Sequence, residues 1–177
     1  MPAAEQGWAL PDGRRIDLFA EQDAVGGRDV VELWIAEAGL SRVEADRRVA
    51  EILLVATDRE RRLIGVSTTY LERNRQLRAD MWYLRVFVAA AHRRSQVGLE
   101  LARISRDHLV RRFVDGSDRR GLGIIFEIEN EMLKRSIPQA IWPRLRFAFI
   151  GETAHGSHVR VYYFPGALAP DPEPGSM

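Results

Sequence analysis

The stretch VFVAAAHRRSQVGLEL, residues 86–101, joins a strand pattern to a helix pattern and organises the rest of the chain. Side chains alternate just before it, which predicts a strand over 81–88 with one face made of Trp82, Leu84, Val86 and Val88. After the polar loop 92–98, apolar residues recur every three to four positions, which predicts a helix to about Phe113. Such a helix is a crossover, so the strands before and after it are expected to be parallel neighbours.

The segments on either side predict further strands and helices. Strands are expected at 15–19, 52–57, 63–72, 81–88, 121–129, 146–151 and 159–164, and helices at 29–38, 41–50, 96–113 and 130–135. Short links between the strands from 52 to 88 imply antiparallel hairpins. The order is strand, two helices, three antiparallel strands, helix, strand, helix, two strands. The predicted fold class is α/β, an α+β mixed sheet with helices on both faces.

Composition sets the outer limits of this interpretation. With 177 residues, 46% of them hydrophobic, the chain predicts one folded domain, expected at 15–166 between a loosely ordered segment 1–14 and a disordered tail 167–177. The absence of cysteine excludes disulfides, thiolate metal sites and a cysteine nucleophile. No stretch is long and apolar enough to span a membrane, and no secretory signal precedes the first strand. The cytoplasm is therefore the expected compartment.

Charge is unevenly distributed along the chain. The formal net charge of +1 argues against a general nucleic-acid binder. Residues 85–120, however, hold nine arginines against four acidic residues, a local excess of five positive charges. This segment contains the loop that leads into the crossover helix. The balance therefore leaves room for a small, multiply charged ligand.

The start of the crossover helix is the first candidate site. The N-terminus of a helix offers backbone N–H groups and a partial positive charge to an anion. Arg93, Arg94 and Ser95 lie in the preceding turn, and Gly98 would allow a phosphate to approach the backbone. Gly98 can equally serve close packing of the helix on a strand. Both interpretations remain open at this point.

The element order and residues 86–101 together resemble the GNAT superfamily of CoA-dependent N-acyltransferases. The resemblance covers about 15–165 and includes a match to the acyl-CoA signature Arg/Gln-x-x-Gly-x-Gly/Ala. Arg93 matches its first position and Gly98 its last. Gln96 replaces the middle glycine, and Ala90 stands near the position of the usual proline.

The resemblance implies acetyl-CoA or another acyl-CoA as co-substrate, no metal, and a small-molecule or peptide amine as acceptor. The amine would attack the acyl group directly. The strand edge at Phe87 and Val88 would pair with the pantetheine amides. The pyrophosphate would lie on the following loop, which comprises Arg93, Arg94, Ser95, Gln96, Val97, Gly98 and Leu99.

Proton transfer is assigned less directly. Glu127 and Glu129 share one face of the strand after the crossover, and either could accept the amine proton through water, with Glu129 nearer the strand end. Both could also be ordinary solvent-facing residues. Asn130 could contact the pantetheine arm or simply cap its helix. The family usually has a Tyr that protonates the leaving thiolate, and Trp142 stands at that position here. Tyr162 or Tyr163 could take this role instead.

Two alternatives of other kinds stay open. Gln96 and the arginine-rich turns 58–62 and 73–78 favour a synthase of the same fold that takes its acyl group from an acyl carrier protein. The missing Tyr and the missing middle glycine favour a non-catalytic domain that binds a ligand or partner. The apolar last strand is compatible with a homodimer.

Overall fold

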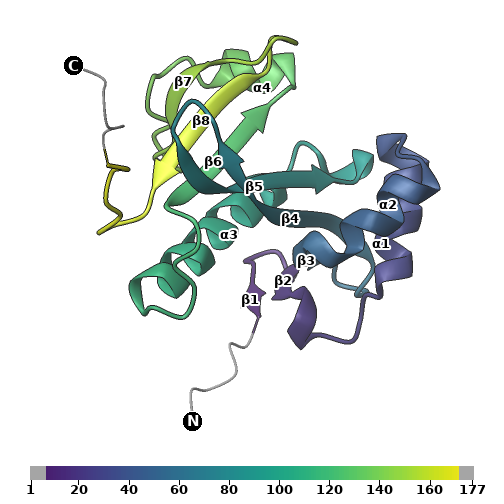
Figure 1. The fold of residues 1–177 in the computed structure, drawn as a ribbon. Coiled ribbons are helices and arrows are strands. Elements are labelled where there is room, and N and C mark those ends of the chain that lie inside the picture. The colour runs from purple at the N-terminus through teal and green to yellow at the C-terminus, as the bar shows by residue number, and fades with distance from the viewer. Residues whose placement is uncertain (1–6, 172–177) are drawn as a thin grey trace. The chain divides into compact units, whose positions relative to one another are not determined.

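The structure is a computed structural model that describes residues 7–171 (Figure 1). The outer parts of the expected terminal segments, 1–6 and 172–177, lie outside the described residues. Within the described range, Trp8 and Ala9 pair with the next strand, so part of the segment 1–14 belongs to the sheet. No helix among residues 7–171 is long and apolar enough to cross a membrane.

The strands confirm the mixed sheet. They are β1 (Trp8–Ala9), β2 (Arg15–Leu18), β3 (Ile52–Thr57), β4 (Leu63–Asn74), β5 (Ala79–Val88), β6 (Gly123–Ile128), β7 (Ala148–Glu152) and β8 (His158–Tyr163). Hydrogen-bonded neighbours follow the order β1-β2-β3-β4-β5-β6-β8-β7. β2 pairs with β3 and β3 with β4 in antiparallel fashion, whereas β5 and β6 are parallel, as the crossover predicts. Compared with the expected strands, β1 is additional.

Within residues 7–171, four α-helices accompany the strands. They are α1 (Gly27–Leu33), α2 (Arg42–Arg48), α3 (Val97–Val114) and α4 (Glu131–Ser136). The expected helix 29–38 begins earlier and changes character, because Trp34–Ala38 forms a π-helix that ends at Gly39 in the left-handed conformation. The predicted capping box starts α2, where the Ser41 side chain accepts a hydrogen bond from the N–H of Glu44.

The described chain forms two compact units. Of the described residues, the first unit comprises 7–69 with Arg85–Ser105, and the second comprises Tyr70–Leu84 with 106–171. In the first unit, alternate residues of β3 face two cores: Leu54 and Ala56 pack with Val97 and Leu101 of α3, and Val55 packs with α1 and α2. Helices therefore cover both faces of the sheet within this unit, because side chains of a strand point to alternate sides.

The second unit has a separate core. Met81 of β5 packs there with Ile125 of β6 and Val161 of β8. Arg160 is the largest of its fully buried side chains and donates to the carbonyl oxygens of Ile137 and Gln139 at 2.9 and 3.1 Å. These bonds satisfy two backbone carbonyls of the segment that follows α4, and the one at Ile137 belongs to a buried residue.

Candidate functional site

The connection from β5 to α3 is a short, well-bonded turn. Ala89 donates its N–H to the carbonyl of Ile64 on β4 at 2.9 Å, which ties the end of β5 to its neighbour. Ala90–His92 then form one 3-10 turn. The Ser95 side chain donates to the carbonyl of His92 at 2.6 Å and accepts from the N–H of Val97 at 3.4 Å. These hydrogen bonds hold the connection in one conformation, which leads directly into the first turn of α3.

The first turn of α3 presents backbone donors. Glu100 makes the first intrahelical bond, to the carbonyl of Gln96 at 2.9 Å. Val97, Gly98 and Leu99 are therefore the helical residues that precede this first bond, and of these the N–H of Val97 bonds to the Ser95 side chain. Gln96 itself is exposed, and Val97 is buried against the sheet. This is the group of amides that an anion at a helix N-terminus contacts.

Gly98 lies against β5. A Cβ atom on Gly98 would stand 3.3 Å from Cγ2 of Val88, a tight but not prohibitive contact. Close packing between helix and strand therefore accounts for part of the requirement for glycine here. The absence of a side chain also leaves the first-turn backbone uncovered, so the two interpretations of Gly98 are compatible.

Arg93 folds back over the end of β5 instead of extending from the loop. Its Nε donates to the carbonyl oxygen of Val88 at 3.2 Å. Its guanidinium carbon lies 5.7 Å from the centroid of the Phe87 ring, within cation–π range. The structure thus brings together three predicted site residues of the first unit, Phe87, Val88 and Arg93.

The predicted residues that follow the crossover helix belong to the second unit. Glu127 and Glu129 are both exposed, on either side of buried Ile128. The Asn130 side chain accepts from the N–H of Leu133 at 2.9 Å, so it caps α4. Trp142 is a core residue, only 8% exposed and stacked on Phe126 with 6.1 Å between ring centroids. Tyr162 and Tyr163 are half-buried and exposed, respectively.

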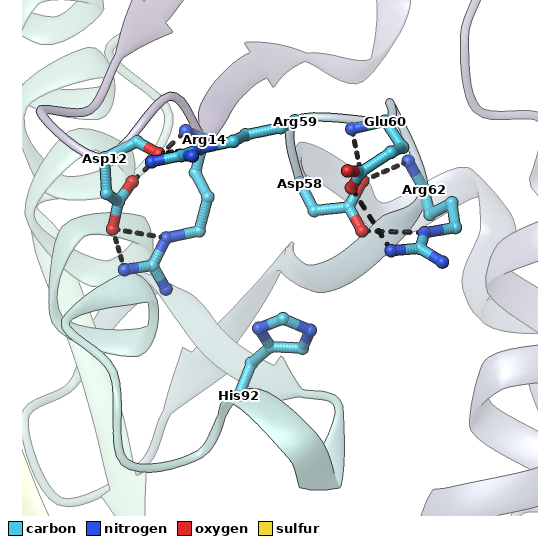
Figure 2. A pocket seen from close by; sticks show the side chains of 7 residues that line it. All are labelled: Asp12, Arg14, Asp58, Arg59, Glu60, Arg62 and His92. Atoms are coloured by element: carbon cyan, nitrogen blue, oxygen red, sulfur yellow. Dashed lines mark hydrogen bonds and ion pairs between the residues drawn. The ribbon is translucent and has the colours of Figure 1, made fainter.

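A polar pocket opens beside the turn at 90–92 (Figure 2). Its cavity volume is about 310 Å³. The lining residues come from the turn before β2, the β3–β4 turn and the end of β5: Asp12, Arg14, Asp58, Arg59, Glu60, Arg62 and His92. Figure 2 shows the His92 ring directed toward the two ion-paired turns. No sequence pattern indicates this pocket, because its walls are up to 80 positions apart in the chain.

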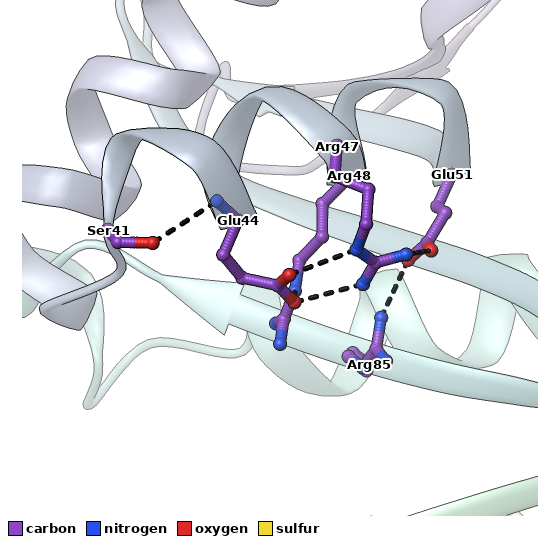
Figure 3. A network of polar contacts seen from close by, with 6 residues as sticks. All are labelled: Ser41, Glu44, Arg47, Arg48, Glu51 and Arg85. Atoms are coloured by element: carbon purple, nitrogen blue, oxygen red, sulfur yellow. Dashed lines mark hydrogen bonds and ion pairs between the residues drawn. The ribbon is translucent and has the colours of Figure 1, made fainter.

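A charged network joins α2 and the 3-10 turn Val49–Glu51 to β5 (Figure 3). Glu51 accepts from Nη1 of Arg47 and from Nη1 of Arg85, both at 2.7 Å. Glu44 accepts from Arg47 and from Arg48, at 2.9 and 2.6 Å. These two hydrogen bonds, first to Arg47 and then to Arg48, lower the pKa of Glu44 from 4.5 to about 2. The network therefore holds Arg85 in place beside Phe87 on β5.

Comparisons with known proteins agree on the fold. No protein-family model matches the sequence, and no curated protein sequence matches it. Among solved structures, the chain is similar to the ribosomal-protein-S5-alanine acetyltransferase of Vibrio fischeri, with a TM-score of 0.60 and 10% identity over 93% of this chain and 100% of that one. A GCN5-related N-acetyltransferase from Kribbella flavida has a TM-score of 0.60 and 20% identity over 88% of this chain and 100% of that chain.

A third similar structure was solved with a ligand. It is a mutant of the AtaT toxin bound to the C-terminus of the antitoxin AtaR and acetyl-CoA, with a TM-score of 0.53 and 11% identity over 86% of this chain and 94% of that chain. At these identities the similarity shows the fold alone. The fold is that of the GNAT superfamily, as the sequence resemblance predicted.

Proposed function

We propose that this protein is an N-acyltransferase that moves an acyl group, in the first instance acetyl, from acyl-CoA to a primary amine. The observation that carries the proposal is the junction of β5 and α3. In the first unit, the end of β5 leads into the first turn of α3, and the second residue of that helix is a glycine. The chain as a whole has the GNAT fold. In this fold the observed junction supports binding of a nucleotide thioester.

The residues at the junction fit such a ligand. The N–H groups of Gly98 and Leu99 are suited to the pyrophosphate, since the first turn of a helix directs backbone donors and the positive end of the helix dipole toward an anion. The backbone of Phe87 and Val88 would pair with the pantetheine amides. Arg93 would then leave the Val88 carbonyl, 3.2 Å from its Nε in the structure, and turn toward the phosphates. The bound thioester supplies the activated acyl group.

Glu129, with Glu127 as the second candidate, would accept the proton that the amine loses on attack. Both side chains are exposed, so water can connect them to the amine. The amine nitrogen would bond to the acyl carbon as the sulfur leaves as a thiolate that takes up a proton. No covalent enzyme intermediate is needed. Asn130 caps α4, and a contact to the pantetheine arm would require it to leave that bond.

The acceptor is proposed only as a class. A primary amine on a small molecule or a peptide is the common chemistry, and the Vibrio fischeri neighbour is named for alanine of a ribosomal protein. A peptide amine therefore comes first among the acceptors to test.

Calorimetric titration with acetyl-CoA and CoA tests the binding step, and detection of free CoA with a panel of amines tests turnover. Dissociation constants in the micromolar range and amine-dependent CoA release are expected. Failure of every acyl-CoA to bind at millimolar concentration would overturn the proposal. Turnover that Glu129→Gln abolishes would exclude a non-catalytic role.

An acyl carrier protein is the second candidate donor. Gln96 is exposed where the GNAT signature has glycine, and Arg59, Arg61 and Arg73 are exposed on the turns at 58–62 and 73–78. A carrier presents an acyl-phosphopantetheine without the nucleotide. Acyl transfer from a carrier thioester but not from acyl-CoA would favour this donor, and the opposite result would exclude it.

A further inference from the structure

The polar pocket beside the turn at 90–92 has three walls that are bonded to one another. The β3–β4 turn is joined to the turn at 10–14, because Arg59 donates its Nε to the carbonyl oxygen of Asp12 at 2.6 Å. It is also next to the end of β5, because Ala89 donates to the carbonyl of Ile64 at 2.9 Å. The pocket of about 310 Å³ is thus part of the folded first unit.

Two of the carboxylates in the pocket close their own turns. Asp12 accepts from the N–H of Arg14 at 3.1 Å and pairs with the Arg14 guanidinium. Asp58 accepts from the N–H groups of Glu60 and Arg62 at 3.0 and 2.8 Å and from Nε of Arg62 at 2.8 Å. The Arg14 side chain lowers the pKa of Asp12 from 3.8 to about 2. The Arg62 N–H lowers the pKa of Asp58. These acids are already satisfied by local donors.

The third carboxylate is paired as well. Glu60 accepts from Nη2 of Arg62 at 3.2 Å, and this ion pair is exposed. Asp12 is thus paired with Arg14, whereas Asp58 and Glu60 share Arg62. Among the described residues, none of these three carboxylates pairs with Arg59 or His92.

Two side chains of the pocket, Arg59 and His92, have hydrogen-bond donors that are available to a ligand. Among the described residues, Arg59 makes one bond through Nε, and its two outer nitrogens have no partner. The His92 ring also has no partner there, and Figure 2 shows it facing the cavity. A guanidinium with two unused nitrogens and an imidazole are donors suited to an anion with several oxygens.

We propose that this pocket binds a phosphate monoester, and that the phosphate is the 3′-phosphate of coenzyme A. The proposal rests on the proposed function, since it places the other end of the same ligand. Arg59 and His92 are the residues assigned to the phosphate. A phosphate monoester carries about −1.5 to −2 charge at pH 7 and three acceptor oxygens, which matches the unused donors.

The position of the pocket along the chain supports this ligand. His92 directly precedes Arg93, the first residue of the loop proposed for the pyrophosphate. In coenzyme A the 3′-phosphate and the pyrophosphate are attached to the same ribose. A ligand with its pyrophosphate on the first turn of α3 therefore has its second phosphate near the turn at 90–92.

A comparison of CoA with 3′-dephospho-CoA by calorimetric titration tests the inference. The intact protein is expected to bind CoA about tenfold more tightly than 3′-dephospho-CoA, the effect of losing charge-assisted hydrogen bonds. Arg59→Gln and His92→Gln are expected to weaken CoA binding by about tenfold and three- to tenfold. Neither substitution is expected to change the affinity for 3′-dephospho-CoA.

Arg61→Gln is the matched control. Arg61 lies on the same turn and is exposed but does not line the pocket, so the substitution removes the same charge from the same segment. It is expected to leave the preference for CoA intact. Thermal denaturation of all three variants separates loss of the pocket from loss of the fold.

The outcomes separate the inference from the function. Equal affinity of the intact protein for CoA and 3′-dephospho-CoA overturns the 3′-phosphate site and leaves the proposed function standing. Absence of binding by either compound overturns both. Binding of inorganic phosphate that depends on Arg59, without a preference for CoA, would support the phosphate site and reassign it to a separate phosphorylated ligand. Loss of the preference in Arg61→Gln would overturn the assignment to Arg59.

Discussion

The carboxylate of Glu37 accepts a hydrogen bond from the backbone N–H of Ala90, with 2.6 Å between Oε2 and N. Glu37 belongs to the π-helix Trp34–Ala38, and Ala90 begins the 3-10 turn that leads to the proposed CoA loop. Ala89, at the cap position of that turn, makes no side-chain capping bond. Glu37 therefore caps the turn from another element. A proline at this position would have no N–H, so this bond requires a residue with a backbone donor, here Ala90.

Replacing Glu37 with Ala is expected to lower the free energy of unfolding by about 1 kcal/mol, the typical net value of a hydrogen bond. The loss should also raise KM for acetyl-CoA several-fold, because the turn at 90–92 positions the loop. kcat is expected to change less. Denaturant unfolding and steady-state kinetics measure the two effects.

Ala90→Pro provides the control for this bond. Ala89 has φ −54° and ψ 142°, a conformation that a residue before proline adopts readily. Proline therefore fits the backbone but removes the N–H donor. Adding Glu37→Ala to Ala90→Pro should change stability by less than about 0.5 kcal/mol, since neighbours that share one interaction do not add. A full additive loss would contradict the capping role of Glu37.

Gly98→Ala separates the two roles of this glycine. Its Cβ would stand 3.3 Å from Val88, so the packing needs only a small shift, and alanine favours a helix by up to about 1 kcal/mol over glycine. Stability is expected to stay within about 1 kcal/mol of the original. Affinity for CoA is expected to fall about tenfold because the methyl group covers the first-turn backbone.

The double variant Val88→Ala with Gly98→Ala relieves the contact and serves as its control. It is expected to bind CoA as weakly as Gly98→Ala. Unchanged CoA affinity in Gly98→Ala would leave packing as the role of Gly98.

Glu129→Gln is expected to lower kcat for amine acylation by about 10²- to 10⁴-fold, the range for loss of a general base. Affinity for acetyl-CoA should not change, because the carboxylate acts on the amine. Glu127→Gln is the matched control, because Glu127 is likewise exposed and lies two residues away on β6, and it is expected to lower kcat much less. A reversed order would assign the base to Glu127, and full activity in both variants would exclude both.

Acid conditions are expected to weaken the network of Figure 3 through Glu44. Its pKa is about 2 in the folded protein, against 4.5 ordinarily, because Arg47 and Arg48 bond to the carboxylate. A lowered pKa contributes stability above the unfolded value, and this contribution is lost as pH falls from about 4.5 to about 2. Glu44→Gln should flatten the dependence of unfolding free energy on pH in this window. Urea denaturation at steps of pH measures it, and equal slopes in both proteins would contradict the assignment.

Several parts of the fold could be predicted because their causes are local. The alternation from Trp82 to Val88 and the helical period after Val97 were enough to predict the crossover and the parallel pairing of β5 with β6. The Ser41 cap was predictable from residues three positions apart. The π-helix at Trp34–Ala38 was not, since its extra residue per turn leaves no clear mark in a pattern of apolar side chains.

In the candidate site, too, the features with local causes could be predicted from the sequence and the contacts between distant segments could not. Residues 86–101 by themselves indicated a strand, an anion-binding turn and a helix, because backbone donors at a helix start follow from local conformation. Only the tertiary structure placed Arg93 on the Val88 carbonyl, Glu37 on the Ala90 N–H, and His92 across from Arg59. Side-chain direction and contacts between distant segments depend on how the strands and helices pack. Sequence periodicity carries no information about them.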